Sequence, residues 1–180
     1  MRIIAGSRKG ARIFAPRGLG TRPTSDMVRE AAFNLIGPLD DASVVDLYAG
    51  SGAMGLEALS RGARRAIFVE ADPVAIAAIE RNLDKLGLIG AAIARGDAAA
   101  WLAGEAAADR RYDLVLIDPP YQMLDTALAS LASKLPDVLA PSGLVVVESD
   151  ASRTPELPLR LRTSRRYGSA RLTLFKAEAP

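Results

Sequence analysis

Two residue types that serve many enzymes are missing from this sequence. Its 180 residues include no cysteine and no histidine. The absence of cysteine excludes disulfides, a thiolate nucleophile and a cysteine-based metal site. The absence of histidine removes the commonest general base and the commonest metal ligand. Any chemistry must therefore use carboxylates, hydroxyls, backbone groups or a cofactor, and we predict no metal site.

Long hydrophobic runs are missing as well. The first residues, Met1–Gly6, hold too short an apolar run for a signal peptide, and no stretch approaches the length of a transmembrane helix. Hydrophobic residues make up 49% of the chain and charged residues 24%, which is typical of a globular protein in water. We therefore predict a cytoplasmic protein with no membrane association.

Acidic side chains are scarce at both ends of the chain. Residues 1–40 carry 7 basic and 3 acidic side chains, residues 151–180 carry 7 and 2, and the residues between them carry 9 and 16. Basic ends favour a polyanionic partner, with nucleic acid first, although a solvated surface explains the same charges equally well. The length favours one domain over 1–180, with 1–40 as a basic extension of a core at 41–180, and we predict a monomer.

The N-terminal extension is predicted to form a β-hairpin followed by a helix. Short strands are expected near Arg2–Ala5 and Ala11–Ala15, joined by a basic turn. Further along, Thr24 or Ser25 is expected to cap a helix that ends at Ile36, because Gly and Pro follow.

Strand and helix candidates alternate from residue 43 onward. The expected strands are Val44–Tyr48, Ala66–Glu70, Ala91–Arg95, Leu114–Ile117 and Leu144–Glu148, and the expected helices are Ala53–Arg61, Pro73–Leu86, Ala98–Ala107 and Leu124–Leu139. Such alternation predicts an α/β fold, with a parallel sheet covered by helices on both faces. Leu159–Arg166 and Ala170–Lys176 are expected to add a final antiparallel hairpin.

A glycine-rich stretch joins the first core strand to the first core helix. Gly50, Gly52 and Gly55 fit G-x-G-x-x-G in the strand–turn–helix context that this motif requires. Glycines permit a tight turn and a close approach of ligand to backbone, and the following helix N-terminus offers free N–H groups. The pattern suits the pyrophosphate of a dinucleotide, and it also suits the methionine end of S-adenosylmethionine.

Acidic residues follow the next two strands. Glu70 lies about twenty residues beyond the first glycine of the motif, the usual spacing for a carboxylate that binds ribose hydroxyls. Asp72 precedes a proline and is assigned the N-cap of the next helix. Asp97 either accepts a hydrogen bond from an adenine amino group or caps its own helix, and the sequence leaves both roles open.

The fourth core strand ends in Asp118-Pro119-Pro120-Tyr121. Two prolines remove two N–H donors and fix two φ angles, which predicts a rigid turn that exposes the Asp118 carboxylate and the Pro119 carbonyl. Two such acceptors can hold the exocyclic amine of a nucleobase and turn its lone pair toward an electrophile, while Tyr121 stacks on the base. A methyl group on a sulfonium needs alignment more than acid–base catalysis. A base within folded RNA must be flipped out to reach such a pocket.

These motifs together resemble those of class I S-adenosylmethionine-dependent methyltransferases, and the Asp-Pro-Pro-Tyr form resembles that of enzymes that methylate exocyclic amines of DNA or RNA bases. Four further stretches resemble the RsmD family, which makes N2-methylguanine in small-subunit (16S) ribosomal RNA: Arg2–Gly6, Arg22–Thr24, Arg29–Asn34 and Asp46–Gly52. The resemblance covers nearly the whole chain. Ser7 departs from the bulkier residue that the family often carries there.

The resemblance implies a Rossmann-like, seven-stranded, mostly parallel sheet with an antiparallel last strand, and S-adenosylmethionine as cofactor. It implies cofactor contacts from Asp46, Tyr48, Gly50, Ser51, Gly52, Gly55, Glu70, Asp97 and Ala98, and catalysis by Asp118, Pro119, Pro120 and Tyr121. It also implies ribosomal RNA as partner, free or within an assembling small subunit. The RNA-binding residues that we predict from resemblance and charge are Arg8, Lys9, Arg12, Arg17, Arg22, Thr24 and Arg29.

Three other functions compete with this interpretation. A nicotinamide-dependent oxidoreductase would use the same glycine motif, but it leaves Asp118–Tyr121 unexplained. A DNA amino-methylase commonly carries a target-recognition domain, for which this chain has no room. A non-enzymatic RNA-binding module would leave the carboxylates at the strand ends without a role.

Overall fold

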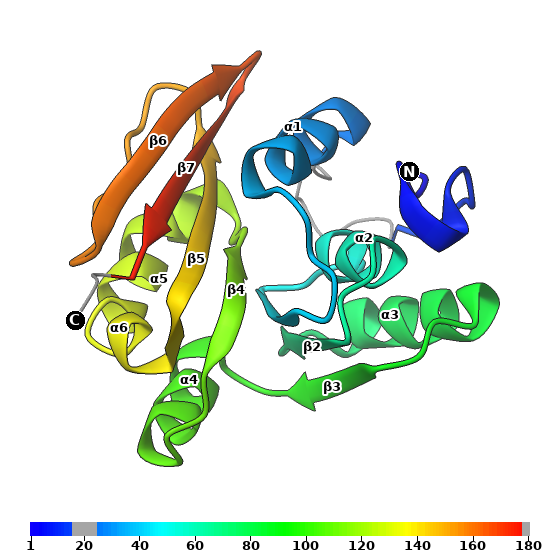
Figure 1. Ribbon diagram of the computed structural model, residues 1–180, viewed down its shortest axis with the longest axis horizontal. Helices are drawn as coiled ribbons and strands as arrows, with labels where there is room; N and C mark the ends of the chain where they lie inside the picture. Colours follow the sequence, from blue (N-terminus) through cyan, green and yellow to red (C-terminus); the bar gives the residue numbers. More distant parts are fainter. Residues whose placement is uncertain (16–24, 178–180) are drawn as a thin grey trace.

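The computed structural model describes residues 1–15 and 25–177. They form a seven-stranded sheet in the order β3-β2-β1-β4-β5-β7-β6 (Figure 1). The strands are β1 Ser43–Leu47, β2 Arg65–Glu70, β3 Ala91–Arg95, β4 Tyr112–Ile117, β5 Leu139–Asp150, β6 Arg160–Tyr167 and β7 Ala170–Lys176. Neighbours from β3 to β5 pair in parallel, whereas β7 is antiparallel to both β5 and β6. The predicted sheet, including its antiparallel last strand, is confirmed.

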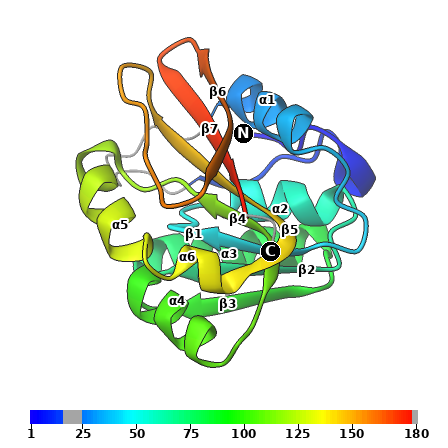
Figure 2. The same ribbon diagram turned by 60° about the vertical axis from the view of Figure 1, so that its left-hand side comes forward.

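Helices cover both faces of the sheet, as Figures 1 and 2 show. Their bounds are α1 Asp26–Ile36, α2 Ala53–Ser60, α3 Pro73–Leu86, α4 Ala98–Ala107, α5 Leu124–Leu131 and α6 Leu135–Val138, with short 3-10 turns η1 at Gly6–Arg8 and η2 at Tyr121–Met123. Successive strand residues point to opposite faces, so Val44 belongs to the hydrophobic cluster under α1, α2 and α3, and Val45 belongs to the cluster under α4, α5 and α6. No helix in the described ranges is both long and apolar enough to span a bilayer.

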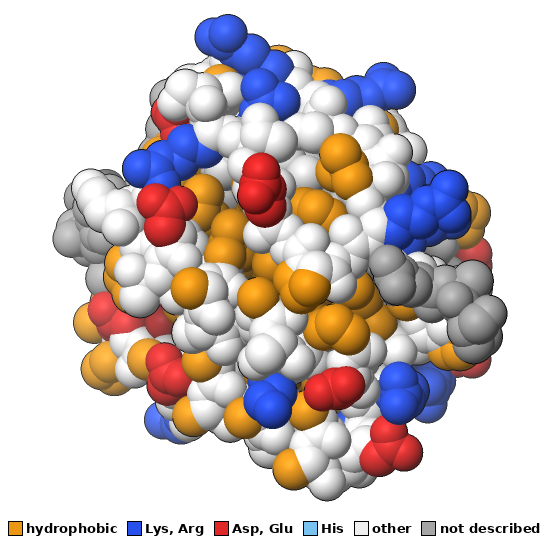
Figure 3. All heavy atoms as spheres, turned by 90° about the vertical axis from the view of Figure 1, so that its left-hand side faces the viewer, with side chains coloured by type: hydrophobic (Ala, Val, Ile, Leu, Met, Phe, Trp, Pro, Cys, Tyr) orange, Lys and Arg blue, Asp and Glu red, His pale blue; other side chains and the backbone are white. Residues whose placement is uncertain are grey.

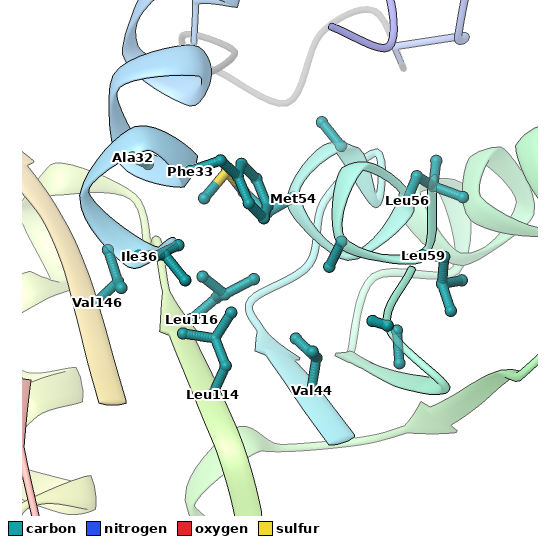
Figure 4. Packing of buried hydrophobic residues seen from close by; sticks show 14 of the residues in the cluster. Ala32, Phe33, Ile36, Val44, Met54, Leu56, Leu59, Leu114, Leu116 and Val146 are labelled. Atoms are coloured by element: carbon teal, nitrogen blue, oxygen red, sulfur yellow. The ribbon is translucent and has the colours of Figure 1, made fainter. Parts of the chain in front are cut away.

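The first of these clusters packs α1 and α2 against the middle of the sheet. In Figure 4, Phe33 of α1 lies against Met54 of α2, and Ile36 and Leu116 lie beneath them. Phe33 is 1% exposed and Leu116 is 1% exposed, so this contact is closed to water. The packing fixes the start of α2, and with it the loop that carries the glycine motif.

Two helix starts agree with the sequence. The Ser25 hydroxyl accepts a hydrogen bond from the Val28 N–H and caps α1, so of the two candidates Ser25 caps this helix. The Asp72 carboxylate accepts hydrogen bonds from Val74 and Ala75 and caps α3 as predicted.

One predicted helix is wrong in its length. The sequence predicts a single helix over Leu124–Leu139, but α5 ends at Leu131, α6 is a single short turn, and Leu139 already begins β5. Pro136 explains the break, because it has no N–H to donate within a helix and its ring collides with the preceding turn. The prediction overlooks this proline.

The predicted N-terminal β-hairpin is also wrong in part. The two segments run antiparallel, with hydrogen bonds from Ile3 N–H to Ala11 O and from Gly10 N–H to Ile3 O, but they form one isolated bridge between Arg2 and Arg12 rather than two strands. Side chains of α2 and α3 take up backbone groups that a longer ladder would use, as described below.

Candidate active site

A pocket of about 510 Å³ opens where β1, β2 and β4 end. The strand order reverses between β1 and β4, which is where ligands bind in open α/β sheets. The volume is in the range of small-molecule sites. The pocket is lined by Met1, Ala15, Asp46, Tyr48, Ala49, Gly50, Ser51, Ala53, Met54, Val69, Glu70, Ala71, Asp72, Ala75, Gly96, Asp97, Ala98, Asp118, Pro119, Pro120, Tyr121, Gln122 and Met123.

The glycine motif forms one wall of this pocket. Gly50 has φ +55°, a conformation that favours glycine. Gly55 faces Phe68 of β2 so closely that a Cβ there would lie 2.4 Å from the ring. The last glycine of the motif therefore lets α2 pack against the sheet, and Gly52 and Gly55 do not themselves line the pocket.

The N-terminus of α2 already has a carboxylate partner. Asp46 is 2% exposed, and its Oδ2 accepts a hydrogen bond of 2.9 Å from the Gly55 N–H. The free N–H groups expected at this helix start are thus partly taken by the protein itself. An external phosphate would meet the Asp46 carboxyl group there instead of free N–H groups at a positively polarised helix end.

Burial raises the pKa of Asp46 well above its ordinary value. The carboxylates of Asp118 and Glu70 raise it further, whereas the hydrogen bond from Gly55 opposes the shift. The folded state consequently holds this proton more tightly than the unfolded chain does. The contribution of Asp46 to stability is therefore lost as the pH rises from about 4 through the raised pKa.

Replacing Asp46 by asparagine is expected to raise the melting temperature at pH 8 by roughly 2–4 °C, or about 1 kcal/mol. Asparagine keeps an oxygen that accepts from Gly55 and removes the buried charge. Thermal unfolding from pH 4 to pH 8 measures the effect, and the difference from the unmodified protein should close near pH 4. An equal difference at both ends of this range would contradict the burial argument. The exposed Asp137 of α6, changed to asparagine, is the control.

Glu70 fastens the glycine loop to the end of β2. Its Oε2 accepts from the Gly50 N–H at 2.8 Å, and its Oε1 accepts from Ala71 and Asp72 at 2.8 and 2.9 Å. A carboxylate has about four acceptor sites, so three are used and one is left for a ligand hydroxyl. Glu70 therefore shapes the loop as well as facing the pocket.

Two further predicted residues, Asp97 and Tyr48, also line the pocket. Asp97 caps α4 by accepting from the Ala100 N–H at 2.8 Å, and it lines the pocket beside Ala98. Tyr48 follows β1 with φ +60°, an uncommon conformation for a residue other than glycine. Burial raises the pKa of Tyr48, the Asp97 carboxylate adds to the shift, and a hydrogen bond with Ser130 opposes it.

The turn Asp118–Tyr121 forms the opposite wall. Asp118 and Tyr121 are half-buried, whereas Pro119 is buried. The Pro120 carbonyl accepts from the Met123 N–H at 2.8 Å and starts η2. Among the described residues no N–H donates to the Pro119 carbonyl. Gln122 and Met123 also line the pocket; the sequence prediction stops at Tyr121, although they follow it directly.

The charge of the lining is strongly one-sided. Five carboxylic acids line the pocket, and no lysine or arginine side chain does so within the described part of the chain: the acids are Asp46, Glu70, Asp72, Asp97 and Asp118. Such a lining favours a cationic ligand and opposes an anionic one. In the same described ranges, no group of three acidic side chains is arranged to hold a metal ion.

The predicted RNA-binding residues fall into three groups: exposed residues, residues outside the described ranges, and the buried Arg29. Arg8, Lys9 and Arg12 are exposed on the N-terminal segment, where the Arg8 guanidinium also donates to the Leu86 and Gly87 carbonyls at the end of α3. Arg17, Arg22 and Thr24 lie outside the described residues.

For Arg29, the prediction of an RNA contact is wrong, because the side chain is 0% exposed. It donates to the Arg2 carbonyl and to Asp26, and its Nε lies 3.6 Å from Glu57. A buried guanidinium requires such partners, and they occupy it.

Glu57 of α2 was not singled out from the sequence, yet it holds the N-terminal segment in place. Its fully buried carboxylate accepts from the Ile4 and Ala5 N–H groups at 2.7 and 3.0 Å and from Arg61 at 2.7 Å. Met1 and Ala15, at the two ends of this segment, line the pocket. Glu57 therefore supports one wall of the pocket from a distance.

Asn82 of α3 connects the same segment to the glycine loop. Its amide accepts from the Phe14 N–H at 2.7 Å and donates to the Phe14 and Ser51 carbonyls at 3.0 Å each. The Phe14 ring lies 3.5 Å from the guanidinium of Arg81. No local pattern marks Asn82, because its partners lie 68 and 31 residues away.

Known proteins place this arrangement in a family. A family model described as Conserved hypothetical protein 95 matches residues 1–176. The chain belongs to this family. The Bacillus subtilis protein YlbH is 38% identical over 98% of this chain and 98% of its own length. Ribosomal RNA small subunit methyltransferase D of Escherichia coli is 34% identical over 99% of this chain and 91% of its own length. The resemblance to the RsmD family is thereby confirmed.

Solved structures agree with the fold. A hypothetical protein from Thermus thermophilus is 31% identical and superposes with a TM-score of 0.84 over 98% of this chain and 99% of its own. TrmN from the same organism shares the fold at 20% identity, with a TM-score of 0.70 over 84% of this chain and 48% of its own. The predicted class I methyltransferase fold is confirmed.

Proposed function

We propose that this protein transfers a methyl group from S-adenosylmethionine to the exocyclic N2 amine of a guanine in small-subunit ribosomal RNA. The observation that carries the proposal is the acid-lined pocket that meets the Asp118–Tyr121 turn, in a chain of this family. The relative in Escherichia coli is named for methylation of this ribosomal RNA.

The electrostatics of the pocket support S-adenosylmethionine over a nicotinamide dinucleotide. The sulfonium and ammonium groups of the cofactor are cationic, whereas a dinucleotide brings a pyrophosphate to the glycine loop. Asp46 already accepts the Gly55 N–H at the start of α2, so this N–H is not free to bind that pyrophosphate. Asp46 and the glycine loop would hold the methionine end, Glu70 the ribose, and Asp97 with Ala98 the adenine side. The cofactor supplies the chemistry, a methyl group on a positively charged sulfur.

The protein's own part is to hold and orient the amine. The lone pair of a guanine amine is delocalised into the ring, so the free amine is a poor nucleophile. The Asp118 carboxylate and the Pro119 carbonyl would accept its two N–H bonds and leave the lone pair directed at the methyl group. Tyr121 would stack on the base. Positioning and fixed acceptors of this kind need neither histidine nor cysteine.

RNA would approach along the N-terminal segment. Arg8, Lys9 and Arg12 are exposed there, and the predicted contacts of Arg17, Arg22 and Thr24 belong to the stretch that follows. We propose that these residues bind phosphates of ribosomal RNA, free or within an assembling small subunit, and that the protein acts as a monomer with residues 1–40 as its RNA-facing extension.

Replacing Glu70 by alanine is expected to weaken binding of S-adenosylhomocysteine by about 1–3 kcal/mol. The variant loses one acceptor for the ribose and the three hydrogen bonds that shape the loop. Calorimetric titration with S-adenosylhomocysteine and, separately, with NAD measures the effect. Glu80 of α3, which pairs with Arg95 on the surface, is the matched control when changed to alanine. Binding of NAD by the unmodified protein, or an unchanged affinity in the Glu70 variant, would contradict the assignment.

A further inference from the structure

The β6–β7 hairpin extends past the sheet edge at which the pocket opens. The last pair between β4 and β5 joins Ile117 and Val147, and Asp118 follows directly. β5 then continues to Asp150, which pairs with Ala170 of β7. Three more residues at about 3.3 Å each carry the hairpin roughly 10 Å beyond the end of β4. Figure 1 shows its tip standing above that end.

The hairpin also lies on the side of the pocket formed by the Asp118–Tyr121 turn. Only β5 and β7 separate β4 from β6 in the sheet. With strands about 4.8 Å apart, β6 lies roughly 14 Å to the side of β4. A nucleic acid strand whose base occupies the pocket would therefore pass beside this tip.

The strand β6 is basic along its whole length. It contains four exposed arginines and no acidic residue: Arg160, Arg162, Arg165 and Arg166. Arg165 and Arg166 lie near the tip, opposite Leu172 and Arg171, whereas Arg160 lies at the far end, opposite Lys176. The two ends of the strand are roughly 20 Å apart. Figure 3 shows Lys and Arg side chains at the upper end of the face that bears the hairpin.

The two arginines at the tip are not committed to ion pairs within the fold. Among the described residues, the Arg165 side chain makes no hydrogen bond or ion pair, and the Arg166 side chain donates only to the nearby Gly168 carbonyl at 2.9 Å. Their neighbours differ, because Arg171 donates to the Ala151 carbonyl and Arg153 pairs with Asp125.

The tip carries its charge on both sides. Arg165 lies in register with Leu172 of the cluster under α1, and Arg166 points to the opposite face because successive strand residues alternate. Two acids lie near the tip in the sheet. Glu148 is in the same register row as Arg165, two strands away, and is buried. Asp150 accepts from Ser152, and Arg153 and Arg166 contribute to lowering its pKa. The two guanidinium groups can therefore contact one nucleic acid strand from two sides. Guanidinium matches the geometry of phosphate.

We propose that this tip, Arg165 and Arg166, is a second RNA-binding site, which holds backbone phosphates of the strand that flanks the target nucleotide. The proposal rests on the proposed function, because it takes ribosomal RNA as the substrate. Phosphate contacts of this kind fix the register of a nucleic acid without reading its sequence. The tip thus sets which nucleotide reaches the Asp118–Tyr121 turn.

The test compares two charge-matched double variants of the full chain. One carries Arg165→Gln with Arg166→Gln at the tip, and the other carries Arg160→Gln with Arg162→Gln at the far end of the same strand. Binding of a protein-free small-subunit ribosomal RNA transcript is measured from 0.05 to 0.3 M salt, with S-adenosylhomocysteine affinity as the fold control. Arg165→Lys with Arg166→Lys keeps the charge and serves as rescue.

The tip variant should weaken RNA binding by roughly tenfold or more at 0.1 M salt and lower the log–log salt slope by about 1.4–1.8, the value for two lost phosphate contacts. The far-end variant should leave the slope near that of the unmodified protein, and the lysine variant should restore most of it. Equal losses of RNA affinity in both glutamine variants would show that net charge alone explains the effect, and this result would overturn the proposal. The proposal would also be overturned if the tip variant bound the transcript normally but did not bind assembled particles. That result would indicate that the tip contacts a protein partner. An unmodified protein that methylates neither the protein-free RNA nor small subunits lacking the modification would refute the proposed function instead.

Discussion

Replacing Asp118 by alanine is expected to lower the rate of methyl transfer by about a hundred- to a thousandfold, or 3–4 kcal/mol, the value of one lost transition-state contact. The carboxylate lies at the end of β4 in the pocket, where it can accept an N–H of the target amine. The backbone acceptor of Pro119 remains in the variant, so residual activity is expected. Asp118→Asn should retain more, because its amide oxygen still accepts.

The measurement is single-turnover methyl transfer to the RNA substrate at saturating cofactor. Affinity for S-adenosylhomocysteine and the melting temperature should stay close to those of the unmodified protein. Asp137→Ala, at an exposed position of α6 outside the pocket, is the control for loss of one negative charge. A variant of Asp118 that turns over near normally would remove this carboxylate from the mechanism and reopen the choice of target atom.

Replacing Glu57 by alanine is expected to destabilise the fold by about 3 kcal/mol, which lowers the melting temperature by roughly 6–12 °C. The change leaves the buried guanidinium of Arg29 without its nearest carboxylate on α2 and takes the acceptor from the Ile4 and Ala5 N–H groups. Breaking a buried ionic cluster on one side is costly because the remaining charge stays buried.

Two further variants test whether the loss of stability is specific to the buried Glu57 carboxylate. Glu57→Gln keeps one acceptor oxygen and should cost less than the alanine variant. Glu80→Ala removes a surface carboxylate whose pairing with Arg95 is exposed, and it should cost less than about 1 kcal/mol. Thermal and urea unfolding give the values. A Glu57→Ala protein as stable as the unmodified one would show that the N-terminal segment does not depend on this anchor.

Much of the core could be predicted because its signals are local. Apolar runs separated by turns marked the strands, and Asp72 beside a proline marked the start of α3. Parallel strands end at one edge of a sheet, so the topology alone brings Asp46, Glu70 and Asp118 into one pocket. Part of the family resemblance lies in the same core, at Asp46–Gly52 and Asp118–Tyr121.

The parts that escaped prediction depend on contacts between distant residues. Arg29 had the charge of an RNA-binding residue, but Glu57, 28 positions away, makes its burial possible. The N-terminal segment had strand-like composition, but its two halves form a single bridge, and Glu57 and Asn82 bind other parts of its backbone. The helix cap formed by Asp97 was one of two open roles, and only the position of the Ala100 N–H reveals it.

The most direct test of the central claim is to locate the methyl group that the protein transfers. Small ribosomal subunits and protein-free small-subunit RNA that lack the modification are incubated with the protein and isotopically labelled S-adenosylmethionine, and the nucleosides are identified by mass spectrometry. The proposed function predicts label in N2-methylguanosine at a single position, transferred about a hundred- to a thousandfold more slowly when Asp118→Ala replaces the unmodified protein. Label on another atom or base, or no transfer by a protein that binds S-adenosylhomocysteine, would contradict it.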